Sequence, residues 1–172
     1  MTRRYGLDES IWFMLLLRSI FFTFLLPGTV TVLIPYWIIS SRGRAAVSNQ
    51  PLKYLGVPLM LIGAFGLLWC IWDFFSAGRG TLAPIDPPKH LVVRGLYRYV
   101  RNPMYVSVVT VLSGEAIFFV SKSVLLEAGI FITLAYLFVV LYEEPVLRRQ
   151  FGESYKRYQQ KVGRWIPRSK AT

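Results

Sequence analysis

Cysteine and histidine are almost absent from this chain of 172 residues, which contains one of each, Cys70 and His90. A single cysteine excludes an intrachain disulfide and any metal site built on several thiolates. One histidine leaves no HExxH pattern and no histidine–cysteine pairing, so we expect no protein-bound metal ion. The chain therefore also lacks the usual pairs that activate a serine or cysteine nucleophile.

Charge is missing from four long apolar segments. Residues 11–39 contain only Arg18, residues 54–71 contain no charge, residues 104–120 contain only Glu115, and residues 124–142 contain only Glu127. A helix that spans a bilayer needs roughly 20 apolar residues. We therefore expect an all-α integral membrane protein with about four transmembrane helices, the last two forming a hairpin at residues 121–123. A break at Pro27-Gly28 would give five membrane elements instead.

Acidic residues are also few, nine against twenty lysines and arginines, which gives a net charge of +11. The basic residues gather between the second and third apolar segments and after the fourth. Because a hairpin brings both groups to one side, the positive-inside rule predicts that this side and the C-terminus are cytoplasmic. Anionic membrane lipids explain the basic tail, so we expect no nucleic acid partner. The first apolar run is too long for a cleaved signal peptide, which favours a retained anchor.

We expect a single domain over residues 1–172. Residues 1–75 would hold the N-terminal membrane helices, residues 76–103 a cytoplasmic loop, residues 104–142 the hairpin, and residues 143–172 a cytoplasmic tail. Pro103 is suited to the first turn of the third apolar helix, with Asn102 as its N-cap. In the tail, apolar and aromatic residues at helical spacing predict an amphipathic helix: Leu147, Phe151, Tyr155 and Tyr158.

Two polar clusters lie at matching ends of the hairpin. The first is the basic and aromatic run Gly95–Tyr105, and the second is the Glu143-Glu144 pair. The Arg101 guanidinium is suited to hold a carboxylate or phosphate, and Glu144 to accept hydrogen bonds from a ligand. Tyr97 and Tyr105 could stack on a heterocycle or face a sulfonium. The alternatives are basic and aromatic residues that merely flank the membrane, and a solvated carboxylate pair.

Glu115 lies about ten residues into its apolar segment, where an ionisable side chain suggests a functional role. We interpret it as part of a tunnel for the substrate, with Arg18 as a candidate partner. A structural, paired carboxylate is the alternative. Glu127 should reach water near the other membrane face. Asp73 should pair with Arg79 or with the basic loop.

The segments LVVRGLYRYVRNPMY and EEPVLRRQFGESYKRYQQKVGRWIP resemble the isoprenylcysteine carboxyl methyltransferase and phospholipid methyltransferase superfamily of membrane enzymes. The resemblance covers Leu91 to Pro167 and implies S-adenosylmethionine as cofactor, with S-adenosylhomocysteine as product. It implies that the following residues bind the cofactor: Tyr97, Arg101, Asn102, Pro103, Tyr105, Glu143 and Glu144. Arg101, Asn102 and Glu115 are the candidate catalytic residues. Asn102 stands where the eukaryotic carboxyl methyltransferases carry histidine, and an amide cannot titrate.

The sequence thus predicts a membrane methyltransferase that acts on a lipophilic or small membrane-soluble acceptor. The acceptor group could be a carboxylate, a thiol or the amine of a lipid headgroup. Two alternatives remain: a membrane reductase of the sterol or isoprenoid type that uses NADPH, and a non-enzymatic membrane subunit. The sequence does not indicate the oligomeric state.

Overall fold

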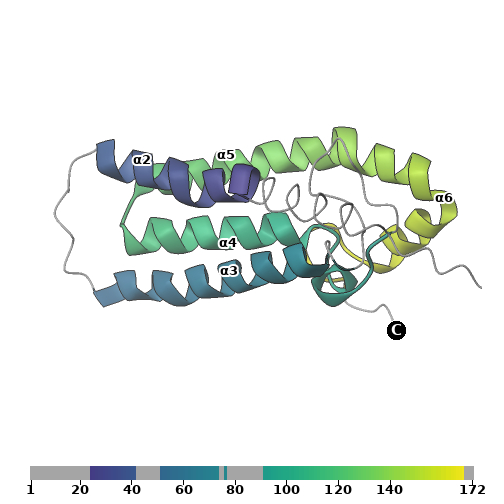
Figure 1. The fold of residues 1–172 in the computed structure, drawn as a ribbon, viewed down its shortest axis with the longest axis horizontal. Coiled ribbons are helices and arrows are strands. Elements are labelled where there is room, and N and C mark those ends of the chain that lie inside the picture. Colours follow the sequence, from purple (N-terminus) through teal and green to yellow (C-terminus); the bar gives the residue numbers. More distant parts are fainter. Residues whose placement is uncertain (1–23, 42–50, 74–75, 77–90, 169–172) are drawn as a thin grey trace, which may run out of the picture.

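The computed structural model describes residues 24–41, 51–73, 76 and 91–168, and these residues form a helical bundle. The bundle contains α3 (Gly56–Asp73), α4 (Pro103–Phe118) and α5 (Lys122–Phe138). These three helices lie side by side along the long axis of the molecule (Figure 1). No strand is formed in the described part of the chain, where the one β-bridge joins Val100 to Gly163. The prediction of an all-α fold is confirmed.

Glycines bring α3 and α4 into close contact. A Cβ atom added to Gly63 of α3 would lie 2.7 Å from the backbone nitrogen of Val111, and one added to Gly114 of α4 would lie 2.7 Å from the carbonyl oxygen of Gly56. Small residues allow backbones to approach in this way, and van der Waals packing is a main source of helix association in lipid. The α3–α4 pair is therefore closely packed and supports the loop between the two helices.

We expect that Gly63→Val destabilises the bundle by about 1–3 kcal/mol, the cost of forcing extra atoms into a packed contact. Thermal unfolding in detergent would measure the change. Gly129→Ala is the matched control, because no atom lies within 4 Å of the added Cβ and alanine favours a helix. Equal stability of the two variants would contradict the close packing.

Two helical stretches are long and apolar enough to cross a membrane: Pro51–Asp73, which includes the short helix η2 (Pro51–Leu55), and Lys122–Lys161. Helix α4 is apolar but has only 16 residues. Large apolar side chains cover the outer face of α3, where Leu61, Ile62, Phe65 and Leu68 are exposed. Such a surface fits lipid rather than water. By length and composition these two stretches are candidate membrane spans, and a total of four crossing helices stays a prediction.

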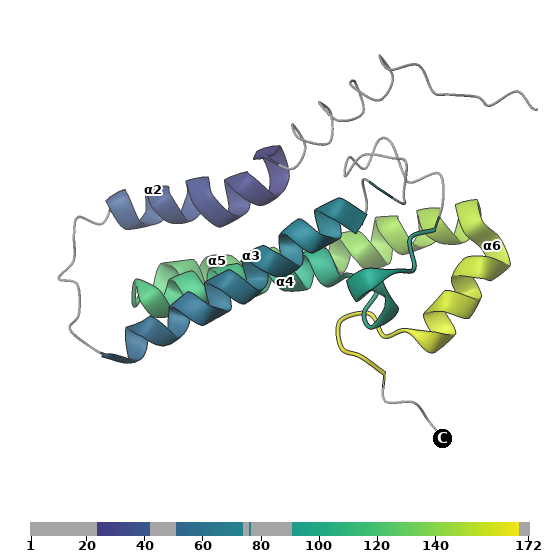
Figure 2. The same ribbon diagram turned by 60° about the horizontal axis from the view of Figure 1, so that its bottom comes forward.

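The described part of the first apolar segment is one continuous helical run. The π-helical stretch η1 (Phe24–Leu33) continues directly into α2 (Ile34–Ser41), and Pro27 lies inside it. This run lies alongside the bundle without reversing direction (Figure 2). The alternative of a hairpin at Pro27-Gly28 is therefore wrong. Arg18 lies outside the described residues.

The last apolar segment does not end its helix at Glu143. Helix α5 continues through the π-helical turn η5 (Val139–Glu143) into α6 (Glu144–Lys161), and the direction changes only at Gly152, where φ is 50°. Beyond Gly152 the chain folds back under the end of the bundle (Figure 2). The predicted amphipathic helix is confirmed, because Tyr155 and Tyr158 form a buried cluster with Leu147 and Phe151. The hairpin turn lies at residues 119–121, since Lys122 already belongs to α5.

Candidate functional site

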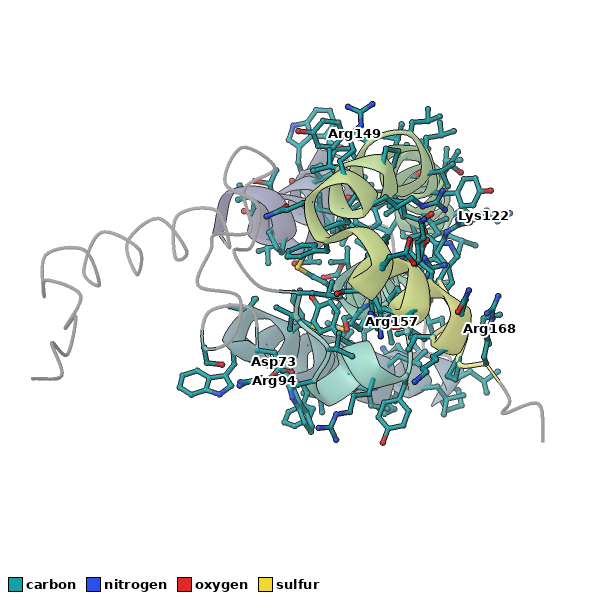
Figure 3. The ribbon with its side chains drawn as sticks, turned by 90° about the vertical axis from the view of Figure 1, so that its right-hand side faces the viewer. Asp73, Arg94, Lys122, Arg149, Arg157 and Arg168 are labelled. Carbon is teal, nitrogen blue, oxygen red and sulfur yellow. The ribbon has the colours of Figure 1, made fainter. Side chains whose placement is uncertain are left out.

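The loop before α4 is fixed to the end of α3. The Arg94 Nε atom donates to Asp73 Oδ1 at 2.8 Å, and Arg94 also bonds Ser76. Gly95 then turns with φ at 52°, and a Cβ there would lie 2.8 Å from the Trp69 indole nitrogen. The expected pairing of Asp73 with the basic loop is confirmed, while Arg79 lies outside the described residues. Figure 3 shows Asp73 and Arg94 next to each other.

The C-terminal segment pairs with this loop and closes the site. The Arg101 backbone N–H donates to the Gly163 carbonyl oxygen at 2.8 Å, and the Asn102 side-chain nitrogen donates to the Arg164 carbonyl oxygen at 3.2 Å. Asn102 occupies the N-cap position of α4, with Pro103 following it. The predicted N-cap position is therefore confirmed. The predicted capping hydrogen bond is wrong, because the Asn102 side chain does not bond the first turn of α4. The buried amide instead ties the loop to a residue 62 positions later in the chain.

Tyr97 and Tyr158 connect the loop to α6. The Tyr158 hydroxyl donates to the Tyr97 carbonyl oxygen at 2.6 Å, and both side chains are buried. Burial raises the pKa of Tyr97 well above its ordinary value, and the negative charge of the nearby Glu143 adds to the effect. Tyr97 therefore stays a neutral phenol at any physiological pH.

Glu144 is the centre of a cluster of arginines. Arg101 donates to its Oε1 atom at 2.9 Å, and Arg164 contacts both oxygens, at 2.8 Å and 3.0 Å. Arg148 lies 3.7 Å from Oε2 on the exposed side. The Glu144 side chain is only 5% exposed and that of Arg101 only 10%. Three positive charges thus surround one buried carboxylate, and the hydrogen bond to Glu144 raises the pKa of Arg164 further.

The Arg101 guanidinium has one N–H group that is not used in a hydrogen bond. Its Nε atom is buried and has no hydrogen-bond partner in the described part of the protein. Buried polar groups are nearly always paired, so an unpaired guanidinium donor beside an excess of positive charge is suited to an anionic ligand.

Glu143 differs from its neighbour. The Tyr105 hydroxyl of α4 donates to the Glu143 Oε2 atom at 3.1 Å, and none of the ion pairs among the described residues includes Glu143. The Tyr105 ring also contacts the Trp165 ring, with centroids 6.2 Å apart. The predicted proximity of the basic loop to the Glu143-Glu144 pair is therefore confirmed through Tyr105 and Arg101.

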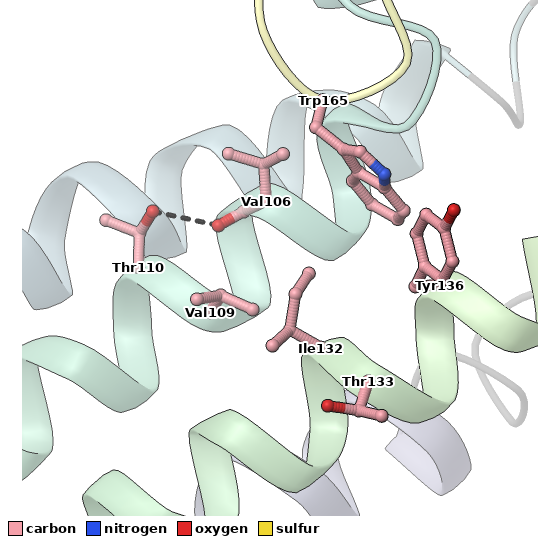
Figure 4. A pocket seen from close by; sticks show the side chains of 7 residues that line it. All are labelled: Val106, Val109, Thr110, Ile132, Thr133, Tyr136 and Trp165. Atoms are coloured by element: carbon pink, nitrogen blue, oxygen red, sulfur yellow. Dashed lines mark hydrogen bonds between the residues drawn. The ribbon is translucent and has the colours of Figure 1, made fainter.

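An apolar cavity of about 450 Å³ lies between α4 and α5 and reaches this site. Figure 4 shows its lining residues: Val106, Val109, Thr110, Ile132, Thr133, Tyr136 and Trp165. Trp165 lies at the end where it contacts Tyr105, and the Arg164 guanidinium lies 5.9 Å from the centre of the Tyr136 ring. The cavity size is within the usual range for small-molecule sites.

Glu115 is not brought to the site. It is 8% exposed and lies twelve residues after Pro103, roughly 18 Å along the helix at 1.5 Å per residue. It interacts electrostatically with Glu127 of α5. Glu127 was expected to reach water, which is wrong, because both its oxygens are buried without a hydrogen-bond partner among the described residues.

Sequence reasoning missed Arg164, Trp165 and Tyr136 as parts of the site. Arg164 is one of many charges in the basic tail, which the sequence analysis attributes to anionic lipids. The adjacent Gly163 offered a signal, because a glycine between an amphipathic helix and a tryptophan permits a close backbone approach. A Cβ there would lie 3.2 Å from the Ile166 carbonyl carbon.

The sequence profile of the phospholipid methyltransferase family matches residues 52–154, which is more than half of the chain. Two proteins described as phosphatidylethanolamine N-methyltransferase, from two strains of Paracoccidioides brasiliensis, are 31% identical over 96 residues. That alignment covers 56% of this chain but only 9% of the length of each fungal protein. A protein of Haemophilus influenzae is 35% identical over 63 residues, 37% of this chain and the whole of that protein. No solved structure matches.

Proposed function

This chain belongs to the phospholipid methyltransferase family, and from that membership we propose that it transfers a methyl group from S-adenosylmethionine to the amine of a lipid headgroup. The family uses S-adenosylmethionine, which supports the choice of cofactor. The fungal relatives are described by their action on phosphatidylethanolamine, which supports an amine over a carboxylate or a thiol. Helices exposed to lipid along their length support an acceptor that arrives from the bilayer.

The observation that carries the proposal is the unpaired, buried Nε atom of Arg101. The amino-acid part of the cofactor carries a carboxylate, and a guanidinium donor with surplus positive charge around it fits that group. Asn102 and Pro103 fix the position of Arg101 at the start of α4. We propose that the cofactor lies against this loop, with Tyr97, Tyr105 and the Glu144 cluster around it.

When bound, the cofactor would supply a methyl group on a positively charged sulfur. The protein's own contribution is position and the exclusion of water, because methyl transfer is an in-line displacement that needs no protein nucleophile. The Arg101 backbone bond to Gly163 and the Asn102 bond to Arg164 hold the loop against the C-terminal segment. Trp165, which lines the apolar cavity, contacts the Tyr105 ring of the polar site.

We propose that the site faces the cytoplasm, where the soluble cofactor is available. The basic side chains on and after α6 support this orientation, since Arg149 and Arg157 belong to α6, which lies at the end of the bundle that carries the site (Figure 1), and Arg168 follows it. A reductase that binds NADPH and a non-enzymatic subunit are the competing functions, and ligand binding separates all three.

We expect S-adenosylhomocysteine to raise the unfolding temperature of the detergent-solubilised protein, whereas NADPH does not. A ligand at a hundred times its dissociation constant stabilises the folded state by about 2.7 kcal/mol. Arg101→Lys keeps a positive charge for Glu144 but removes the Nε donor, and it should weaken binding by about 1.5–3 kcal/mol. Arg98→Lys, on an exposed side chain of the same loop, is the control. Stabilisation by NADPH alone, or by neither ligand in folded protein, would contradict the proposal.

A further inference from the structure

The Arg101 Nε atom, to which the proposed function assigns the cofactor's carboxylate, is closed off from solvent. The Arg101 side chain is only 10% exposed, and the Nε atom itself is buried. Tyr155 and Tyr158 of α6 interact electrostatically with this side chain. A ligand of the size of S-adenosylmethionine reaches a buried atom only when part of the protein moves away first. The site therefore has to open before the cofactor enters.

The part of the protein that covers this atom is the chain after the bend in α6. Residues 153–168, which we call the C-terminal cover, fold back under the end of the bundle (Figure 2). The Tyr158 hydroxyl of the cover donates to the Tyr97 carbonyl oxygen at 2.6 Å, and Arg164 bonds both oxygens of Glu144. Two hydrogen bonds from the loop before α4 to backbone carbonyl groups of the cover complete the polar contact. These bonds and the apolar cluster around Tyr158 hold the cover against the site.

Gly152 is suited to be the hinge of this cover. Its φ of 50° and ψ of −123° are not helical, although α6 is helical on both sides of it. A Cβ atom at this position would have no atom within 4 Å, so no packing at Gly152 itself fixes the bend. Glycine adopts positive and negative φ about equally readily. A change of Gly152 to helical φ and ψ would make α6 one straight helix and carry the cover away from Arg101.

We propose that the C-terminal cover opens about Gly152 to admit S-adenosylmethionine and to release S-adenosylhomocysteine. This inference rests on the proposed function and adds the route by which the cofactor is exchanged. In the orientation proposed above, the cover faces the cytoplasm, so the cofactor enters from water and the lipid acceptor does not use this route. The closed cover excludes water from the site, and the open cover allows exchange of the soluble ligand.

Gly152→Ala is expected to favour the open cover, because alanine is strained at a positive φ and is favourable in a helix. Hydrogen exchange tests this without a ligand. The Arg101 amide bonds the Gly163 carbonyl oxygen across the edge of the cover, and it should exchange about tenfold faster or more. The Val162 amide bonds the Tyr158 carbonyl oxygen inside the cover, so its rate should stay within about twofold. Equal acceleration of both amides would indicate local unfolding and would overturn the proposal.

Gly129→Ala is the matched control, because its added Cβ also has no atom within 4 Å but Gly129 lies inside the helix α5. This variant should leave the exchange of both amides unchanged. Tyr158→Phe is a second test, which removes the bond to the Tyr97 carbonyl oxygen and leaves the hinge as it is. It should also speed exchange at the Arg101 amide. An unchanged Arg101 amide in both Gly152→Ala and Tyr158→Phe would overturn the proposal.

Ligand kinetics test the route itself, with the full-length protein in detergent and S-adenosylhomocysteine as the probe. In the wild type, the binding rate measured by stopped-flow fluorescence should level off at high ligand concentration, where opening of the cover limits it. Gly152→Ala should raise the dissociation rate by about tenfold or more. Bound ligand should slow exchange at the Arg101 amide of the wild type.

A binding rate that rises in proportion to concentration, an unchanged dissociation rate in Gly152→Ala, or an Arg101 amide that bound ligand does not protect would each overturn the opening of the cover. All three outcomes include ligand binding and leave the proposed function standing. A folded wild-type protein that binds no S-adenosylhomocysteine would overturn both.

Discussion

Glu144→Gln is expected to lower the free energy of unfolding by about 3 kcal/mol, the low end of the range for breaking a buried ion pair. The low end applies because Arg164 and Arg148 are partly exposed and water can screen them. The change leaves the nearly buried Arg101 without its counter-charge. Chemical denaturation in detergent would measure the loss.

The same variant should bind S-adenosylhomocysteine more weakly by about 1.5–3 kcal/mol, because Arg101, which we propose holds the cofactor's carboxylate, loses its own anchor. Glu153→Gln is the matched control, since it also removes a glutamate of α6 but from an exposed pair with Lys156. A Glu144→Gln protein with wild-type stability and affinity would show that the arginine cluster is not needed for the site.

Arg164→Ala is expected to release residues 162–168 from the loop before α4. The variant removes two hydrogen bonds to a buried carboxylate, each worth about 1.5–3 kcal/mol when a charge is involved. The Asn102 and Arg101 bonds to this segment are made through backbone carbonyl groups and should weaken with it. Hydrogen exchange at the Arg101 amide, which bonds Gly163, should become at least tenfold faster.

Loss of this segment should also carry Trp165 away from the cavity, so turnover should fall strongly. Arg148→Ala serves as control, because Arg148 contacts the same carboxylate at 3.7 Å from an exposed position. If both variants change the hydrogen-exchange rate of the Arg101 amide equally, the bidentate contact of Arg164 with Glu144 is not what closes the site.

Several features of the site were predictable because they depend on local signals. The apolar segments predicted the helices, and the position of Gly95–Tyr105 and of Glu143-Glu144 at matching hairpin ends predicted their contact. The Tyr105–Glu143 and Arg101–Glu144 hydrogen bonds confirm it. Asn102 shows the limit of such reasoning. Asparagine is a favourable N-cap residue, but the Asn102 side chain here donates to the distant Arg164 carbonyl oxygen instead.

The partners of the two glutamates could not be predicted. Whether Glu143 or Glu144 meets the arginines depends on the phase of the helix, and the π-helical turn that ends at Glu143 changes that phase. The sequence also did not show that the helix carrying this pair continues past it to Gly152.

The sequence by itself determined that this is an α-helical protein of the phospholipid methyltransferase family, with a basic loop close to two carboxylates. Hydropathy and short motifs encode these properties because each depends on neighbouring residues. The tertiary structure decided which carboxylate is paired and which is open, that the C-terminal Arg164 and Trp165 complete the site, and that an apolar cavity leads to it. Those properties depend on contacts between residues 20 to 62 positions apart, which helix phase and chain reversal set and no local pattern records.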